Sequence, residues 1–293
     1  MSRRRLVLAL STVLVLAVAA GLYWFHVAGR VRKSVEAWSE DRRAAGWRVE
    51  YRDLSVGGPP WRPTARLEVP AITLPGGWRA EAATATVEVD PLGRGGEVHA
   101  ISLRLTAGAT MVAIAALALS VSSAPPELGF TVAADGIDPP QPAGLGLDPR
   151  ITRLEVAGRV RGGVPKAATP AALAAWSADG GTVEIDRLAL DWAPLALEAD
   201  GTVTFDAGLQ PLAAFAARVR GAAPLIDRLA ANGRIEAGAA LAAKTVLILL
   251  ARPDSQGRPA VPVPVTIQDG QMWLGPARVA AVPPIRWPDG AGP

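Results

Sequence analysis

Few residues of this chain have the side-chain chemistry that catalysis needs. The 293 residues include two histidines and no cysteine, which excludes disulfides, thiolate nucleophiles and cysteine-based zinc or iron–sulfur sites. His26 and His99 fall on different predicted elements, so we do not expect them to meet in an acid–base or metal centre. No nucleophile-elbow, P-loop or zincin motif is present, and no glycine-rich dinucleotide motif stands at a predicted strand–helix turn.

Carboxylates are plentiful, and one group of four lies close together in the sequence: Asp186, Asp191, Glu198 and Asp206. Hydrolysis by paired carboxylates needs two of them on converging elements. These four alternate with apolar residues instead, which is typical of the solvent-facing side of a strand. We therefore predict no catalytic residue, no cofactor and no metal, and a protein that is not an enzyme.

Tryptophan is the most informative aromatic residue, with nine Trp against four Phe and two Tyr. An indole ring has an apolar body and one donor, which suits a partly wet edge. Two interpretations stay open: the rings line the rim of an apolar groove or a membrane-facing lip, or they plug the ends of a β core. The residues at predicted strand ends or beside Gly/Pro breaks are Trp38, Trp47, Trp61, Trp78, Trp192, Trp273 and Trp287.

The elements that position these residues begin with an apolar N-terminal segment. Leu6–Val27 is uncharged, and its 22 residues reach roughly 33 Å as a helix, enough to cross a bilayer core. Arg3–Arg5 precede it, so the positive-inside rule predicts a cytoplasmic N-terminus, a single inner-membrane span and a periplasmic body. The alternative is a signal peptide cut after Ala17-Val18-Ala19.

Charge divides the chain at the same place. Residues 1–33 carry six basic and no acidic side chains, whereas residues 34–293 carry 24 basic and 27 acidic ones. The excess of positive charge therefore belongs to the N-terminal segment, and the rest of the chain is mildly acidic. A nucleic-acid binder needs a basic face on its folded domain, so we expect no nucleic-acid partner.

The remaining sequence predicts five regions. Residues 1–28 form the cytoplasmic tip and anchor or signal peptide, and 29–46 a juxtamembrane helix ended by Gly46 as its C′ residue. Residues 47–134 form a first β-rich half, 135–149 a Pro/Gly linker, and 150–293 a second β-rich half. This second half includes helices over Ala171–Ala178, Pro224–Ala231 and Glu236–Leu250.

The strands are predicted from apolar residues that recur with a period of two between Gly/Pro turns. A phase shift predicts a bulge near Asp53, and Asp269-Gly270 predicts a hairpin turn. Residues 109–121 fit a buried strand or a buried helix equally well. The predicted fold is a β-rich α+β fold, in which an N-terminal transmembrane helix precedes an extended, curved antiparallel sheet with a few packed helices.

Short motifs at both ends of the chain carry a resemblance to a known family. They are Trp38, Gly46-Trp47, Tyr51, Val56-Gly57-Gly58-Pro59, Arg66-Leu67, Asp269-Gly270 and Leu274-Gly275-Pro276. With these motifs the chain resembles the domain-of-unknown-function family numbered 2125, from Gram-negative and mostly alphaproteobacterial species. The family usually has Gly-Phe-Pro where this chain has Gly58-Pro59, and Trp61 is the candidate substitute for the missing aromatic residue.

The resemblance covers almost the whole chain and implies an anchored envelope protein with no established activity. The plan of the body is also similar to that of AsmA-like and lipid-bridge proteins, which is a likeness of fold and not of site. The candidate signature or groove-rim residues are Trp38, Gly46, Trp47, Tyr51, Gly58, Pro59, Trp61, Asp269, Gly270 and Gly275.

Two functions follow as hypotheses. The first is a membrane-anchored periplasmic scaffold or carrier that binds an apolar envelope component such as lipid, because the predicted sheet has Ala, Val and Leu on one face. The second is a structural or protein-interaction module of the envelope without a ligand, with its apolar face filled by its own helices. The expected partners are the inner membrane and a lipid or an envelope protein.

Overall fold

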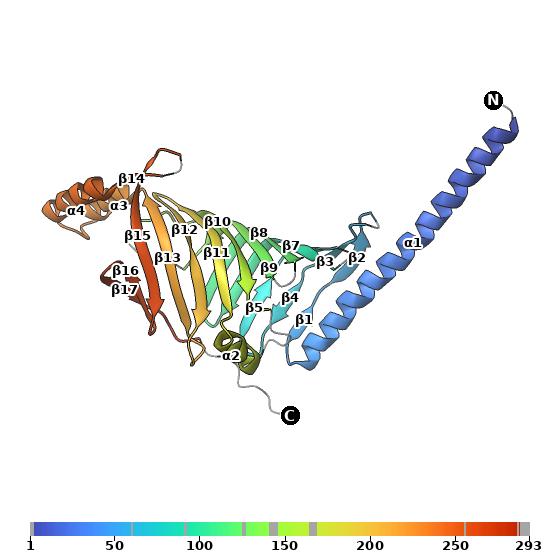
Figure 1. Ribbon diagram of the computed structural model, residues 1–293, viewed down its shortest axis with the longest axis horizontal. Coiled ribbons are helices and arrows are strands. Elements are labelled where there is room, and N and C mark those ends of the chain that lie inside the picture. Colours follow the sequence, from blue (N-terminus) through green and yellow to red (C-terminus); the bar gives the residue numbers. More distant parts are fainter. Residues whose placement is uncertain are drawn as a thin grey trace.

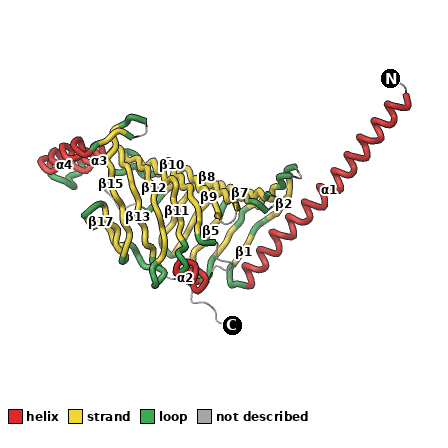
Figure 2. Tube along the Cα trace, in the orientation of Figure 1, coloured by secondary structure: helices red, strands yellow, loops and turns green. Residues whose placement is uncertain are grey.

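A computed structural model describes residues 3–59, 61–90, 93–124, 127–140, 146–163, 169–254, 256–285 and 287, with side chains from residue 23 onward except residue 124. The strands among these residues form one long, curved antiparallel sheet. A long helix, α1, extends away from one end of it, and a helical hairpin lies beyond the other end (Figure 1). Figure 2 shows the strands as the central body of the molecule, with the helices at the margins of the sheet.

The helix α1 runs without a break over Arg3–Ala44. Gly46 follows it in the left-handed conformation (φ 81°), and Gly46 N and Trp47 N donate to the carbonyl oxygens of Arg43 and Arg42, each at 3.0 Å. This pair of hydrogen bonds satisfies the last helical carbonyls in a Schellman arrangement. Gly46 is therefore the C′ residue that the sequence predicts.

Across the residues that the structure describes, none of the helices has both the length and the apolar content of a membrane span. The predicted anchor Leu6–Val27 lies within α1. Most of its side chains fall outside the described residues, so the anchor stays a prediction.

Seven strands open the sheet, and the first six are short and form three interrupted long strands. Their bounds are β1 (Arg48–Glu50), β2 (Asp53–Gly57), β3 (Thr64–Glu68), β4 (Ala71–Thr73), β5 (Trp78–Glu81), β6 (Thr84–Val89) and β7 (Gly95–Ala107). β1 and β2 pair with β4 and β3 in a single register, so each two short strands act as one long strand. In the same way, β4 and β3 pair with β5 and β6 in a single register. β6 and β5 then pair with the two halves of β7.

The interruptions lie side by side and form a line of backbone irregularities across the sheet. Arg52 N donates to Glu68 O at 2.8 Å, and Val69 N donates to Ala83 O at 3.0 Å. Val69 and Ser102 on this line have positive φ angles of 47° and 54°. The alternation of side chains shifts by one residue here, which bends the strands while keeping the apolar residues on one face. The predicted bulge near Asp53 is the first of these irregularities.

Nine further ladder strands continue the sheet as a meander, and β14 pairs separately with β15. The strands are β8 (Thr110–Ala124), β9 (Glu127–Asp138), β10 (Ile151–Arg161), β11 (Thr182–Trp192), β12 (Leu195–Phe205), β13 (Pro211–Arg220), β14 (Arg252–Pro253), β15 (Pro259–Gln268), β16 (Gln271–Leu274) and β17 (Ala277–Ala281). Residues 109–121, which the sequence left open between helix and strand, form most of β8. Their neighbours β7 and β9 offer ladders on both sides.

The sheet also continues past the segment predicted as a linker, residues 135–149. β9 extends through Asp138 and pairs with β10, with Ile137 opposite Ile151. The strand persists because Ile137 is buried beside Ile114 and Leu103. Residues 141–145 of the segment lie outside the described residues.

Three shorter helices complete the fold: α2 (Pro170–Ala178), α3 (Ala222–Ala231) and α4 (Ala237–Leu250). All three were predicted, with ends that differ by one or two residues. Thr169 caps α2, because its Oγ1 accepts from Ala172 N at 3.3 Å, and Pro170 supplies the fixed φ of the first helical position.

At two glycines on the inner strands, the absence of a side chain leaves room for an aromatic ring from the neighbouring strand. A Cβ atom at Gly201 would lie 2.6 Å from Cδ1 of Phe215, and one at Gly158 would lie 2.9 Å from Cζ of Phe130. Both would also overlap a backbone carbonyl oxygen of the adjacent strand. The aromatic rings therefore cover the backbone where the glycines leave room.

Replacing these glycines by alanine is expected to destabilise the sheet. We predict that Gly201→Ala and Gly158→Ala each lower the free energy of unfolding by about 2–3 kcal/mol, because the new methyl group overpacks the strand. Urea denaturation of the full chain followed by tryptophan fluorescence measures the change. Gly238→Ala in α4 is the control: its Cβ would meet no atom within 4 Å, so it should leave stability unchanged or raise it. Equal effects of the three substitutions would contradict the packing argument.

Candidate functional site

The most extensive feature of the molecule is an apolar face that crosses the sheet from β2 to β15. Residues that are direct partners in an antiparallel ladder point to the same side, so the register identifies each face. In the described pairs, this side carries no charged residue from Val49 to Ile267. Its larger central members are Leu103, Leu105, Val112, Ile114, Leu117, Leu119, Phe130, Val132, Leu154, Val156, Ile185, Leu188, Leu190, Leu197, Val203, Phe215, Val219, Val263 and Val265.

The opposite face is a lattice of ion pairs between neighbouring strands. Arg159 lies 2.7 Å from Asp186, and Arg161 lies 2.6 Å from Glu184. The hydrogen bond from Arg159 to Asp186 and its charge raise the pKa of Arg159 above its ordinary value. Exposed ion pairs each contribute little to the free energy of unfolding. The main effect of the lattice is that this face of the sheet is the one in contact with water.

Helices cover the apolar face only near its margins. Val31 and Val35 of α1 pack against the cluster of Leu54, Ala65 and Leu67 on β2 and β3. Elsewhere, α2 packs on β12 and α4 on β15, so within the described residues no helical layer lies over the middle of strands β7 to β11 in Figure 1. Most of the central side chains are consequently half-buried, neither enclosed nor fully exposed.

A small core does form on this face, along the line of irregularities. Its buried members come from the loop after β5 and from β7, β8 and β9: Ala82, Ala100, Leu103, Ile114, Ala134 and Ile137. Strands of the same sheet bury them, which places the apolar face on the inside of the bend. Three of these six residues are alanine, and the small side chains leave room for Leu103, Ile114 and Ile137 to pack together.

Three tryptophans close the ends of strands, which favours, at these three positions, the interpretation that the rings plug the ends of a β core. The indole nitrogens of Trp176, Trp192 and Trp287 donate to backbone carbonyls at 3.0, 2.8 and 3.0 Å. Trp287 also meets the ring of Phe205 edge-on, with 5.9 Å between centroids. Trp78, by contrast, lies exposed at the apolar margin of β5.

The first group of predicted signature residues lies where α1 meets the sheet. Trp38 is on an exposed part of α1, and Gly46 ends that helix. Trp47 lies under the guanidinium of Arg42, 5.6 Å from its ring centroid, and Tyr51 packs beside the β2–β3 cluster. Gly46, Trp47 and Tyr51 therefore lie at the junction between helix and sheet, whereas Trp38 is exposed on the helix.

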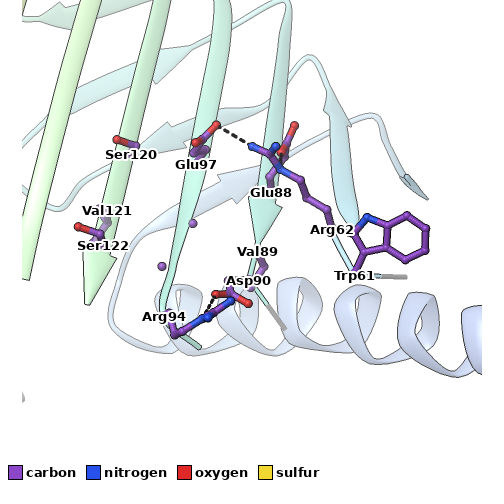
Figure 3. A pocket seen from close by; sticks show the side chains of 12 residues that line it. Trp61, Arg62, Glu88, Val89, Asp90, Arg94, Glu97, Ser120, Val121 and Ser122 are labelled. Carbon is purple, nitrogen blue, oxygen red and sulfur yellow. Dashed lines mark hydrogen bonds and ion pairs between the residues drawn. The ribbon is translucent and has the colours of Figure 1, made fainter. Parts of the chain in front are cut away.

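The second group surrounds the turn between β2 and β3. Gly58 has φ 81°, and a Cβ there would lie 2.7 Å from Arg62 O, so the turn requires glycine. Pro59 O accepts from Arg62 N at 2.9 Å. Trp61 is 75% exposed and stands at the entrance of a surface hollow of about 340 Å³ (Figure 3).

The hollow is lined by charges that neutralise one another. Figure 3 shows Arg62 pointing at Glu88 and Glu97, with separations of 2.5 and 3.4 Å, and Arg94 beside Asp90 at 2.7 Å. Its cations already have carboxylate partners, so an anionic ligand would have to displace them. We therefore regard the apolar face as the stronger candidate site.

The third group lies at the far edge of the sheet. Asp269 and Gly270, with φ 52° and 66°, form the predicted hairpin turn between β15 and β16, of the type that matches the strand twist. Gly275 (φ 56°) makes the next turn, and its N donates to Pro264 O at 2.8 Å. The structure thus distributes the ten signature residues over three separate places and does not gather them into one site.

The other residues considered for chemistry lie on the polar side of the sheet, in the turn after β12 or on α1. Asp186 pairs with Arg159, Glu198 pairs with Arg220 at 3.0 Å, and Asp206 accepts from two backbone N–H groups of its own turn. His99 Nε2 lies 3.4 Å from Glu97. Sequence reasoning missed the extent of the apolar face, whose only sequence signal is the shared alternation of many separate strands.

A buried carboxylate joins the ends of β13 and β15 at the far side of the sheet. Burial raises the pKa of Asp254, but hydrogen bonds from the backbone N–H groups of Arg258 and Gln256, and then the Arg258 side chain, outweigh it and lower the pKa to about 2. Arg220 Nη1 donates to the same carboxylate at 3.0 Å. Asp254 therefore clamps the loop after β14 to the end of β13.

This clamp predicts a loss of stability in acid. A carboxyl group whose folded-state pKa is depressed stabilises the protein above its unfolded pKa, and this contribution disappears as pH falls from about 4 to about 2. Asp254→Asn should lower the urea midpoint at pH 7 and bring variant and wild type together near pH 2. Asp200→Asn, at an exposed ion pair with Arg218, is the control and should change little. A gap that stays constant over this pH range would rule out the charge of Asp254 as its source.

Comparison with known proteins agrees with the family resemblance of the motifs. Residues 24–93 and 93–283 match the model of a family described as an uncharacterized protein conserved in bacteria (DUF2125). Neither the comparison with curated proteins nor the comparison with solved structures gives a match. Since the match extends over most of the chain, the protein belongs to the DUF2125 family of uncharacterised bacterial proteins.

Proposed function

We propose that the protein is a non-enzymatic, membrane-anchored carrier or scaffold that binds an apolar component of the cell envelope, such as lipid acyl chains, on the apolar face of its sheet. The observation that carries this proposal is the uncharged face of the sheet, which in the described part of the chain carries α2 on β12 but no helix packed on β7 to β11. Apolar surface left in water costs roughly 25 cal/mol per Å². A bound acyl chain would remove that cost.

The dimensions of the face suit a long apolar ligand. Seven ladder strands (β7 to β13) stand about 4.8 Å apart, so the central face is roughly 29 Å across. This width is close to the hydrocarbon thickness of a bilayer, about 30 Å.

The proposed location is the inner membrane, with the N-terminus in the cytoplasm and the sheet in the periplasm. α1 is one continuous helix, so the predicted anchor Leu6–Val27 and the segment that packs on β2 belong to one rod. Tyr23 and Phe25 are exposed on it, as expected for aromatic residues at a membrane interface. Such a rod would hold the first edge of the sheet close to the bilayer.

Site-specific photocrosslinking in living cells tests the proposal with the full chain. A photoreactive phenylalanine analogue at Val132 or Leu188, on the apolar face, should give adducts with phospholipid that mass spectrometry detects. The same analogue at the adjacent Thr131 or Arg187, which are exposed on the opposite face, is the matched control and should give none. Protein adducts in place of lipid at Val132 and Leu188 would favour the structural or interaction module instead, and equal lipid labelling of both faces would refute a specific site.

A further inference from the structure

The hairpin of α3 and α4 directs apolar side chains away from the body of the protein. On α4, Ala240 is buried and Lys244 pairs with Asp227 of α3 at 2.9 Å, so these two positions face inward. On the outward side, Leu241, Ile248 and Leu249 are 69%, 75% and 70% exposed. A helix at a protein–water boundary normally shows the opposite arrangement, with its charged residues outside.

The orientation of the hairpin is fixed by polar contacts at its base. Arg228 of α3 donates to Asp148 at 2.7 Å and to Gly146 O at 3.1 Å, in the segment before β10. Arg220 just before α3 and Asp254 just after α4 form the clamp described above. The outward apolar side of α4 is therefore a built surface and not a frayed end.

Charge distinguishes the hairpin from the rest of the body. Residues 222–252 carry four basic and two acidic side chains, whereas the remainder of residues 34–293 carries 20 basic and 25 acidic ones. Arg252 donates to Leu249 O at 3.1 Å, which holds its guanidinium beside the most exposed apolar residues. An apolar strip next to basic side chains is typical of helices that lie in the interface of an anionic bilayer.

We propose that the α3–α4 hairpin docks on the surface of an anionic phospholipid bilayer, with Leu241, Ile248 and Leu249 below the headgroups. The 14 residues of α4 reach roughly 21 Å, too short to span a bilayer but long enough to lie along its interface. This contact is at the end of the sheet opposite α1 (Figure 1). It is independent of whether the apolar face of the sheet binds lipid.

An environment-sensitive fluorophore tests the contact in the full chain. The sequence has no cysteine, so Ile248→Cys gives a single labelling site, and Thr202→Cys on the exposed polar face of β12 is the matched control. The labelled protein is placed in phosphatidylcholine nanodiscs, in nanodiscs containing phosphatidylglycerol, or in phosphatidylcholine nanodiscs mixed with phosphatidylglycerol vesicles. We expect a blue shift and a gain in intensity at position 248 in one or both anionic samples, and none at position 202.

Two further variants identify the forces. Leu241→Glu and Leu249→Glu in the Ile248→Cys background should each weaken the response at least about tenfold, because each places a charge in the apolar strip. Circular dichroism checks that the helices remain folded. The Arg252→Gln variant should require a higher content of anionic lipid for the same response.

Three outcomes would overturn the inference. One is a water-like emission at position 248 in every sample, and a second is an equal response to neutral and anionic lipid. The third is a shift that depends on protein concentration in neutral nanodiscs, which would assign the surface to a second copy of the chain. The readout that decides the inference comes from position 248 on the hairpin, so failure here leaves the crosslinking result on the sheet unaffected.

Discussion

A single layer of strands has two faces, and in the described strand pairs from Val49 to Ile267 this chain keeps its charged side chains on one of them. The alternation must then stay in phase over every strand, including the strands that bend. Val69 and Ser102 adopt positive φ angles where the phase shifts, so Leu67 and Leu103 stay on the apolar side, both buried. The apolar face stays unbroken because a few residues adopt strained backbone conformations. The same irregularities bend the strands and so curve the sheet.

The long sheet also has to protect its edges, and it does so differently at its two ends. At the first edge, α1 supplies donors to strand carbonyls: Arg43 to Val49 O at 2.8 Å and Arg32 to Leu54 O at 2.9 Å. An added strand could not pair there without displacing both side chains. At the last edge β17 is short and fully exposed, and Arg278 lies within it. A short strand and a charged side chain both discourage the pairing of another strand at such an edge.

Local signals in the sequence predicted local structure well, because a cap or a turn depends on a few neighbouring residues. Gly46 after α1 and Asp269-Gly270 after β15 are examples. The continuation of β9 through Ile137, and the choice of strand for residues 109–121, depend on partners elsewhere in the chain, which periodicity does not reveal. Ile101 shows the same limit: the sequence groups it with Leu103 and Leu105, but the shift at Ser102 places it on the polar face, 57% exposed. One apolar face was predicted from the sequence, but its extent escaped prediction for this reason, since it exists only through the register of many strands.

The order of the strands gives the two proposals a common geometry. The proposed anchor joins the sheet at β1 and β2, and the proposed docking hairpin joins it at β13 and β15, so the apolar face would run from one membrane contact to the other. Neighbouring strands are about 4.8 Å apart, and an acyl chain lying across them would meet apolar side chains at each step without entering water. A carrier built in this way needs no closed cavity. It needs a continuous apolar surface with membrane contact at its ends, which explains why the central strands would be left without covering helices.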